Sequence, residues 1–217
     1  MEVTRDEMVD EQIVARGVRD RLVIDAMRHV PREQFVPSES REMAYRDSPL
    51  PIPQEQTISQ PYIVACMVEA LELNGGEKVL EIGTGSGYAA AVLAEIAGEV
   101  YSIERIRQLA EHAANTLSKL NYSNVHVLHG DGTGGCPEHA PFDAIVVAAG
   151  GPKVPKSLKS QLAIGGRLVI PVGSTKSQKL VRIRRLSKLK FKTEAIVDVR
   201  FVPLIGHEGW KIVGKAI

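Results

Sequence analysis

The chain has 217 residues, of which 44% are hydrophobic and 24% are charged, and its formal net charge is +1. That length can bury one sizeable core and the charge lacks the basic excess typical of non-specific nucleic-acid binding, so we expect one domain and no nucleic-acid partner. No apolar run approaches the ~20 residues of a membrane span, and the first residues are too charged for a secretory signal, so we expect a cytoplasmic protein with no membrane partner.

The first sixty residues combine helical patterns with prolines. Two stretches, RDEMVDEQIVARG and DRLVIDAMRHV, carry apolar residues at helical spacing. The next stretch, VPREQFVP, interrupts that spacing with prolines. We therefore expect a short N-terminal helical cap.

A proline-rich loop, DSPLPIPQEQ, then runs into a helix that Pro61 can open. Thr57 and Ser59 lie between the loop and this helix, and their spacing alone fits both a helix cap and a ligand contact. The helix carries Cys66, and the other cysteine of the chain is Cys136. The two belong to no CxxC pair, so we expect neither a disulfide framework nor a metal site.

From Lys78 onward, short β-rich runs alternate with helical stretches such as ERIRQLAEHAANTLSKL. This alternation is typical of βαβ units. It predicts an α/β fold with a doubly wound, mostly parallel sheet that helices cover on both faces. The predicted strands are KVLEIG, EVYSIE, VHVLHGD, FDAIVVAA and RLVIPV.

Two longer alternating runs, QKLVRIRRLSK and FKTEAIVDVRFVPL, follow with no helix-length segment between them. They predict an antiparallel C-terminal hairpin on one side of the sheet. Their basic residues could suggest an RNA-binding surface, but the alternate spacing favours the solvated face of a strand pair. These residues are Lys179, Arg182, Arg184, Arg185, Lys188, Lys190 and Lys192.

The stretch VLEIGTGSGY places three glycines on alternate positions after a predicted strand. Gly83, Gly85 and Gly87 allow a tight turn and let a ligand approach the backbone. The dinucleotide-binding pattern needs a small residue where this chain has Tyr88, and a charged Glu81 would repel the pyrophosphate of NAD. S-adenosyl-L-methionine, a nucleoside with a positive centre and no phosphate, suits this turn better.

Two acidic residues follow the next predicted strands. Glu104 comes about twenty residues after the turn, where a carboxylate can accept hydrogen bonds from both ribose hydroxyls. Asp131 and Gly132 follow the third strand, where a carboxylate and a backbone N–H can meet an adenine. Singly, these features also fit a tight turn, a helix-opening acid and a turn residue. Together, on consecutive strand ends, they favour a nucleoside site.

Eight short stretches occur in the order VPREQFVP, QTISQPYIVA, VLEIGTGSGY, ERI, HGDG, PFDAIVVAAG, GGRLVIPVG and RFVPLIG. Together they resemble the protein-L-isoaspartate O-methyltransferase family, from about Val30 to Gly206. Many methyltransferases share the glycine motif, whereas QTIS and FVPL at these places are specific to this family. One departure is Glu55, which stands where family members often carry glycine.

The resemblance implies a class I, Rossmann-like methyltransferase domain over residues 1–217. Residues 1–60 would form the helical cap and substrate loop, and residues 61–217 the cofactor-binding sheet and the hairpin. The implied reaction moves a methyl group from S-adenosyl-L-methionine, leaving S-adenosyl-L-homocysteine, to the free α-carboxyl group of L-isoaspartyl residues in damaged proteins and peptides. The ester then cyclises to a succinimide, whose hydrolysis returns some aspartate. Because a carboxylate is ionised at neutral pH, no general base is required.

By the family's pattern Ser59 is the catalytic position, Thr57 lies beside it, and FVPLIG presents backbone groups to the substrate. We expect a monomer. The alternatives are another class I methyltransferase acting on RNA or a small molecule, and a non-catalytic RNA-binding module. The expected cofactor contacts are Thr57, Glu81, Gly83, Thr84, Gly85, Gly87, Tyr88, Glu104, Arg105, Asp131 and Gly132. The expected substrate contacts are Thr57, Ile58, Ser59, Val202 and Leu204.

Overall fold

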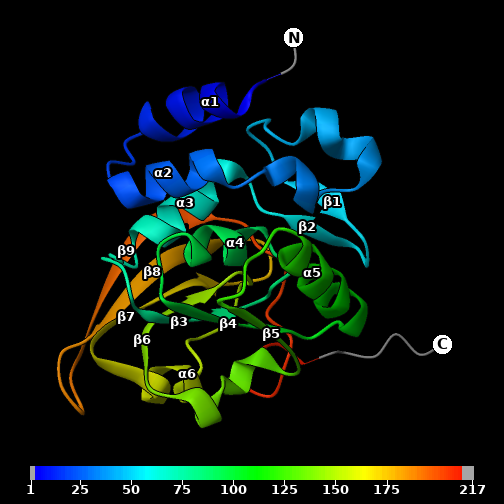
Figure 1. Cartoon of the computed structure of the whole chain (residues 1–217). Coiled ribbons are helices and arrows are strands. Elements are labelled where there is room, and N and C mark those ends of the chain that lie inside the picture. Colours follow the sequence, from blue (N-terminus) through cyan, green and yellow to red (C-terminus); the bar gives the residue numbers. More distant parts are fainter. Residues whose placement is uncertain (1–2, 212–217) are drawn as a thin grey trace.

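A seven-stranded sheet forms the centre of the computed structural model, which describes residues 3–211 (Figure 1). Its strand order is β5-β4-β3-β6-β7-β8-β9. The strands from β5 to β7 pair in parallel, and β8 and β9 extend the sheet antiparallel. This confirms the predicted mostly parallel sheet with its antiparallel hairpin. The strands are β3 Lys78–Ile82, β4 Glu99–Glu104, β5 Val125–His129, β6 Phe142–Val147, β7 Leu162–Gly173, β8 Gln178–Arg185 and β9 Phe191–Val199.

The two faces of the sheet bury separate hydrophobic clusters. On β3, Val79 belongs to one cluster and its neighbour Leu80 to the other, and Val146 and Ile145 on β6 divide in the same way. Because successive side chains of a strand point to opposite faces, strands covered on both sides carry continuous apolar runs. Figure 1 shows α6 on one face and α3, α4 and α5 on the opposite face. The helices are α3 Pro61–Glu69, α4 Tyr88–Ala94, α5 Arg107–Lys119 and α6 Lys156–Gln161.

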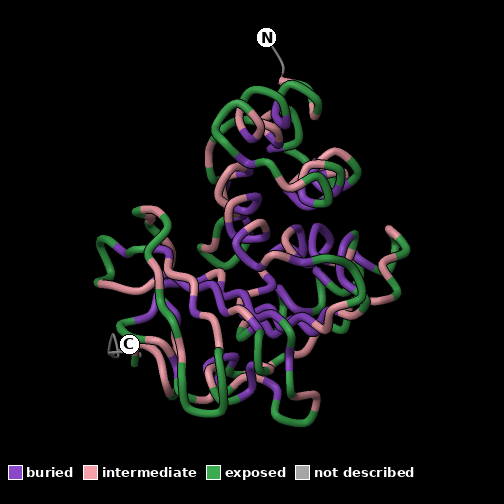
Figure 2. The backbone as a smooth tube through the Cα atoms, turned by 90° about the vertical axis from the view of Figure 1, so that its left-hand side faces the viewer, coloured by how far each residue is buried: buried purple, intermediate pink, exposed green. Residues whose placement is uncertain are grey.

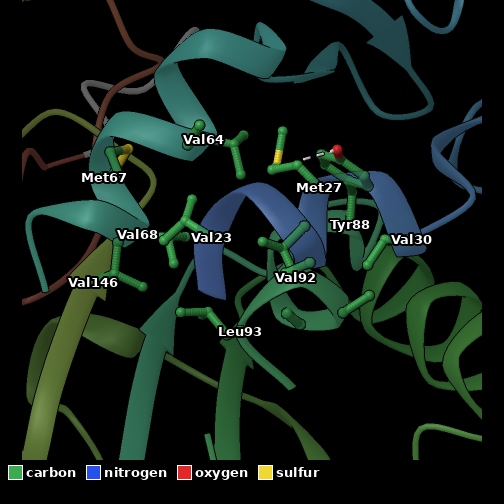
Figure 3. Close-up of a cluster of buried hydrophobic side chains, with 14 of the residues drawn as sticks. Val23, Met27, Val30, Val64, Met67, Val68, Tyr88, Val92, Leu93 and Val146 are labelled. Carbon is green, nitrogen blue, oxygen red and sulfur yellow. Dashed lines mark hydrogen bonds between the residues drawn. The ribbon is translucent and has the colours of Figure 1, made fainter. Parts of the chain in front are cut away.

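The N-terminal segment forms the predicted helical cap above α3 and α4. Helix α2 (Arg21–His29) begins at Asp20, whose carboxylate accepts a hydrogen bond from the Leu22 N–H at 2.9 Å. Figure 3 shows Met27 of α2 meeting Tyr88 of α4, so the cap and the sheet share one buried cluster. Buried segments lie between the cap and the sheet and along the strands, and exposed segments form the turns at the surface (Figure 2). The other cap elements are α1 Arg5–Glu7, a π-helical segment Met8–Val14, and 3-10 helices Arg32–Phe35 and Ser38–Met43.

A short antiparallel hairpin stands where the sequence predicts a loop. Strand β1 (Leu50–Ile52) pairs with β2 (Gln56–Ile58). Strands of three residues beside prolines carry too little periodic pattern to be recognised in a sequence. The turn holds Gln54 at φ 62° and Glu55 at φ 57°, in the left-handed region that glycine adopts without strain. A left-handed backbone thus explains why glycine suits the position of Glu55.

Arg182 and Arg184 of the β8–β9 hairpin form ion pairs, whereas the sequence predicts that they lie on a solvated face. Arg182 contacts Glu72 at 2.6 Å and Glu194 at 2.7 Å, and Arg184 contacts the second oxygen of Glu72 at 2.6 Å. The arginines therefore tie the hairpin to the end of α3. Within residues 3–211, no helix is both long and apolar enough to cross a membrane.

Candidate active site

The glycine turn joins β3 to α4 at the carboxyl edge of the sheet. Gly83, Gly85 and Gly87 have φ values of 95°, 54° and 91°, which other residues adopt only with strain. The Gly83 N–H donates to the Ile103 carbonyl oxygen at 2.8 Å, so the turn is fixed to β4. Gly87 precedes α4, and a Cβ there would lie 3.3 Å from Ala113 on α5. The turn is therefore closed by positive φ angles and close packing, as the sequence predicts.

Glu104 ends β4 directly opposite this turn. One of its carboxylate oxygens accepts from the Gly85 N–H and the other from the Ile106 N–H, both at 2.9 Å. The side chain is buried, yet it lines the pocket described next. Because each carboxylate oxygen has two lone pairs, Glu104 retains acceptor capacity on both oxygens. The predicted ribose acceptor is thus held rigidly beside the turn.

A pocket of about 850 Å³, including its open mouth, lies between this edge of the sheet and the β1–β2 hairpin. We call it the first pocket. It brings together most of the predicted residues: Thr57, Ile58, Ser59, Gly83, Thr84, Gly85, Tyr88, Glu104, Arg105, Gly132, Val202 and Leu204. Glu81, Gly87 and Asp131 are not part of its lining.

The first pocket also has lining residues that the sequence analysis missed. Ala148 and Ala149 directly follow β6, and Ile103 and Ile106 flank Glu104. The rule that ligands bind at the carboxyl ends of parallel strands, which located Glu104, could have located the two alanines as well. Pro203 lies in the C-terminal segment, and its approach to the glycine turn has no local signal in the sequence.

Glu81 lies behind the glycine turn, fully buried. It accepts a hydrogen bond from the Ser102 hydroxyl at 2.5 Å, and the Ser102 oxygen lies 2.5 Å from the Thr84 hydroxyl. Burial raises the pKa of Glu81 to about 8, so it is mostly uncharged at neutral pH. The assumption of a charged Glu81 that repels NAD is therefore wrong. The prediction against NAD rests on Tyr88 alone, and a cofactor contact of Glu81 stays a prediction.

Asp131 is occupied by bonds within the protein. One carboxylate oxygen accepts from the Thr133 N–H at 2.9 Å and from its hydroxyl at 2.7 Å, and the other accepts from the His207 N–H at 2.8 Å. These hydrogen bonds hold the pKa of Asp131 below its usual value. Asp131 thus fastens the C-terminal segment to the sheet edge, whereas its neighbour Gly132 lines the first pocket. The predicted contact of Asp131 with adenine stays a prediction.

A second pocket, open to solvent, adjoins the first. We call the residues that line both the shared wall: Thr57, Ser59, Ala148, Val202 and Pro203. Beyond the wall, the second pocket is lined by Pro49, Gln60, Ile63, Thr175 and residues 198–201. A group held at the wall can therefore meet occupants of both pockets.

The two hydroxyl groups of the shared wall are not helix caps. The residue that precedes α3 is Gln60, and no side chain caps this helix. Between residues 3 and 211, neither the Thr57 nor the Ser59 hydroxyl donates a hydrogen bond to another side chain or to the backbone. This removes the capping alternative for Ser59 and leaves both hydroxyls available to a ligand.

The backbone of the C-terminal segment is partly engaged. Gly150 donates to the Val202 carbonyl oxygen and accepts from the Leu204 N–H, both at 2.8 Å, and Trp210 donates to the Leu204 carbonyl oxygen at 2.7 Å. The Val202 carbonyl and both backbone groups of Leu204 are therefore paired within the protein, and the expectation that the FVPLIG segment presents backbone groups to a peptide stays a prediction.

Comparisons with known proteins agree with this arrangement. The family model described as protein-L-isoaspartate(D-aspartate) O-methyltransferase (PCMT) matches residues 3–209. Protein-L-isoaspartate O-methyltransferase 1 of Rhodopseudomonas palustris (strain HaA2) is 65% identical over 96% of this chain and 86% of its own length. Protein-L-isoaspartate O-methyltransferase 2 of Pelobacter propionicus is 59% identical over 96% of this chain and 93% of its own length.

Solved structures similar to this chain include members of the same family. A structure named protein-L-isoaspartate O-methyltransferase has a TM-score of 0.84 at 30% identity, covering 95% of this chain and 67% of its own. A Plasmodium falciparum PCMT structure in complex with S-adenosyl-L-homocysteine has a TM-score of 0.78 at 24% identity, and the match covers 93% of this chain and 98% of that one. This second match shows a likeness of fold. This chain belongs to the protein-L-isoaspartate O-methyltransferase family.

Proposed function

We propose that this chain transfers a methyl group from S-adenosyl-L-methionine to the free α-carboxylate of L-isoaspartyl residues in proteins and peptides. The observation that carries the proposal is the shared wall, where the Thr57 and Ser59 hydroxyls, unpaired within residues 3–211, line both the first pocket and the open second pocket. Membership of the family supplies the substrate class, and the wall supplies a place where the two reactants can meet.

The residues of the first pocket fit the adenosine part of the cofactor. Glu104 offers free lone pairs to a pair of ribose hydroxyls, and Ile103 and Ile106 offer apolar surface to a flat base. The glycines of the turn leave the backbone accessible from the pocket side. Bound S-adenosyl-L-methionine supplies a methyl group on a positively charged sulfur.

The second pocket fits the peptide. It is open to solvent, as a site for residues within a protein chain must be, and it leads to the shared wall. Thr57 and Ser59 can donate hydrogen bonds to an anionic carboxylate. Val202 and Pro203 add apolar surface to the same wall.

The catalytic work assigned to the chain is orientation. The substrate carboxylate is ionised at neutral pH, so the reaction requires no proton abstraction. Ser59 donates to one carboxylate oxygen and thereby aims the other toward the first pocket, a positioning effect that reduces the entropic part of the barrier. The nearby acids Glu104 and Asp131 are held in hydrogen bonds and need not act as bases.

The test uses two peptides that differ only in an isoaspartyl or aspartyl linkage, each incubated with the protein and methyl-labelled S-adenosyl-L-methionine. We expect label in the isoaspartyl peptide and none in its isomer. Equal labelling of both peptides, or labelling of RNA instead, would contradict the proposal and favour another class I methyltransferase.

We further propose that the protein acts as one monomeric domain in the cytoplasm, without a nucleic-acid partner. The near-neutral net charge and the pairing of the hairpin arginines with acidic residues support the last point. Light scattering should give the mass of a monomer. Salt-dependent binding of RNA would contradict the absence of a nucleic-acid partner.

A further inference from the structure

Arg32 is a charged side chain buried directly behind the shared wall. It is fully buried in the 3-10 helix Arg32–Phe35 of the cap. Its Nε donates to the Ala44 carbonyl oxygen at 2.7 Å, and its Nη2 donates to the Ser59 carbonyl oxygen at 2.8 Å. The guanidinium also lies 4.6 Å from the ring centre of Tyr88, which lines the first pocket.

No carboxylate neutralises this cation. Within residues 3–211, Arg32 forms no ion pair, and its buried Nη1 has no hydrogen-bond partner. The adjacent Glu33 faces another cation instead, since its carboxylate lies 3.5 Å from Arg5. Buried cations are normally paired, because removing a charge from water without compensation is costly, and a guanidinium stays protonated even when burial lowers its pKa.

We propose that Arg32 is a positioning residue for the methyl-transfer reaction, and that its charge complements the substrate carboxylate at the shared wall. The inference rests on the proposed function. Its hydrogen bond to Ser59 fixes the backbone that carries the donor hydroxyl. Its positive charge contacts the carbonyl oxygen of the residue that carries this hydroxyl, in a buried region where electrostatic attraction is weakly screened.

The Arg32 side chain contributes in two ways, through its hydrogen bonds and through its charge. The bonds to Ala44 and Ser59 join the cap to the end of β2, so they control where the Ser59 hydroxyl lies. The charge favours an anionic ligand over a neutral one of the same shape. A lysine retains the charge but has a shorter reach and lacks the planar fork, whereas a glutamine lacks the charge.

A purely structural role for Arg32 is the competing explanation, and Arg5 provides the matched control. Arg5 also joins elements of the cap, donating to the Tyr45 hydroxyl at 3.0 Å and to the Arg28 carbonyl oxygen at 3.1 Å. It lines neither of the two pockets. Loss of Arg5 should therefore loosen the cap without affecting recognition of the carboxylate.

The experiment measures peptide affinity by calorimetry in the presence of S-adenosyl-L-homocysteine, and kcat for methylation of the isoaspartyl peptide in a separate assay with S-adenosyl-L-methionine. The ligands are an isoaspartyl peptide and its isoasparaginyl analogue, which has a neutral amide in place of the α-carboxylate. The proteins are the wild type, Arg32→Gln, Arg32→Lys and Arg5→Gln, each with its melting temperature and its affinity for S-adenosyl-L-homocysteine.

We expect Arg32→Gln to reduce the preference for the anionic peptide about tenfold, while the affinity for S-adenosyl-L-homocysteine changes less than twofold. Arg32→Lys should keep the preference for the anionic peptide but lower kcat about tenfold. Arg5→Gln should have the wild-type preference and the wild-type kcat. An unchanged preference in Arg32→Gln would overturn the proposal. If Arg32→Gln does not fold, loss of the preference or a wild-type kcat in Arg32→Lys would overturn it. A wild type that does not methylate isoaspartyl peptides would instead refute the proposed function.

Discussion

Replacement of Ser59 by alanine separates orientation of the substrate from stabilisation of the fold. Because the Ser59 hydroxyl bonds to no other described residue and α3 has no side-chain cap, the substitution should change the free energy of unfolding by less than about 0.5 kcal/mol. A lost cap would cost about 0.5 to 2 kcal/mol. A lost donor to a carboxylate is worth roughly 1.5 to 3 kcal/mol, or about ten- to a hundredfold in rate.

The assay is single-turnover methylation of an isoaspartyl peptide, with a thermal melt for each protein. Ser59→Ala should be slow at a wild-type melting temperature, and its affinity for S-adenosyl-L-homocysteine should be unchanged. Ser118→Ala, on the exposed side of α5, is the control and should match the wild type. The wild-type kcat should stay level from about pH 6 to 8, because an ionised carboxylate needs no base. A wild-type rate in Ser59→Ala would refute the reasoning.

Three further substitutions test other parts of the structure. Glu104→Ala should weaken binding of S-adenosyl-L-homocysteine by roughly 1.5 to 3 kcal/mol in calorimetry, with the exposed Glu111→Ala as control; equal affinity would remove Glu104 from the site. Folding raises the pKa of Glu81 from 4.5 to about 8, so between these pH values the folded state binds a proton that the unfolded state does not. The free energy of unfolding should therefore fall as pH rises from about 4.5 to 8, by up to about 1.4 kcal/mol per pH unit. Denaturant titrations from pH 5 to 8 should show that slope in the wild type and a smaller one in Glu81→Gln, and equal slopes would contradict the assignment. Glu55→Gly should stabilise the protein by up to about 1 kcal/mol, because the residue has a φ of 57°, and a destabilised variant would show that the left-handed turn is not strained.

The parts of the fold that the sequence predicts are those with a long or chemically distinctive local pattern. The apolar runs of β3 and β6 are continuous because both faces of the sheet are covered, so their strands are evident without the structure. The glycine turn is evident because its φ angles exclude most other residues. The β1–β2 hairpin lacks such a pattern, because each of its strands has only three residues.

The parts of the site that escape prediction depend on contacts between distant segments. The shared wall joins Ser59 to Val202 and Pro203, which are far apart in the sequence. The uncharged state of Glu81 follows from its burial behind the turn. The Asp131 carboxylate accepts a hydrogen bond from the backbone of His207, which is distant in the sequence. The environment of each of these residues is a property of the folded chain, which a local sequence pattern does not contain.

The fate of the substrate carboxyl group tests the proposed methyl transfer most directly. An isoaspartyl peptide is incubated with the protein and excess S-adenosyl-L-methionine, and its products are resolved by chromatography and mass spectrometry over several hours. We expect one base-labile methyl ester per isoaspartyl residue, followed by a succinimide and by the aspartyl peptide. A methyl group that resists mild base, or a peptide that stays entirely isoaspartyl, would contradict it.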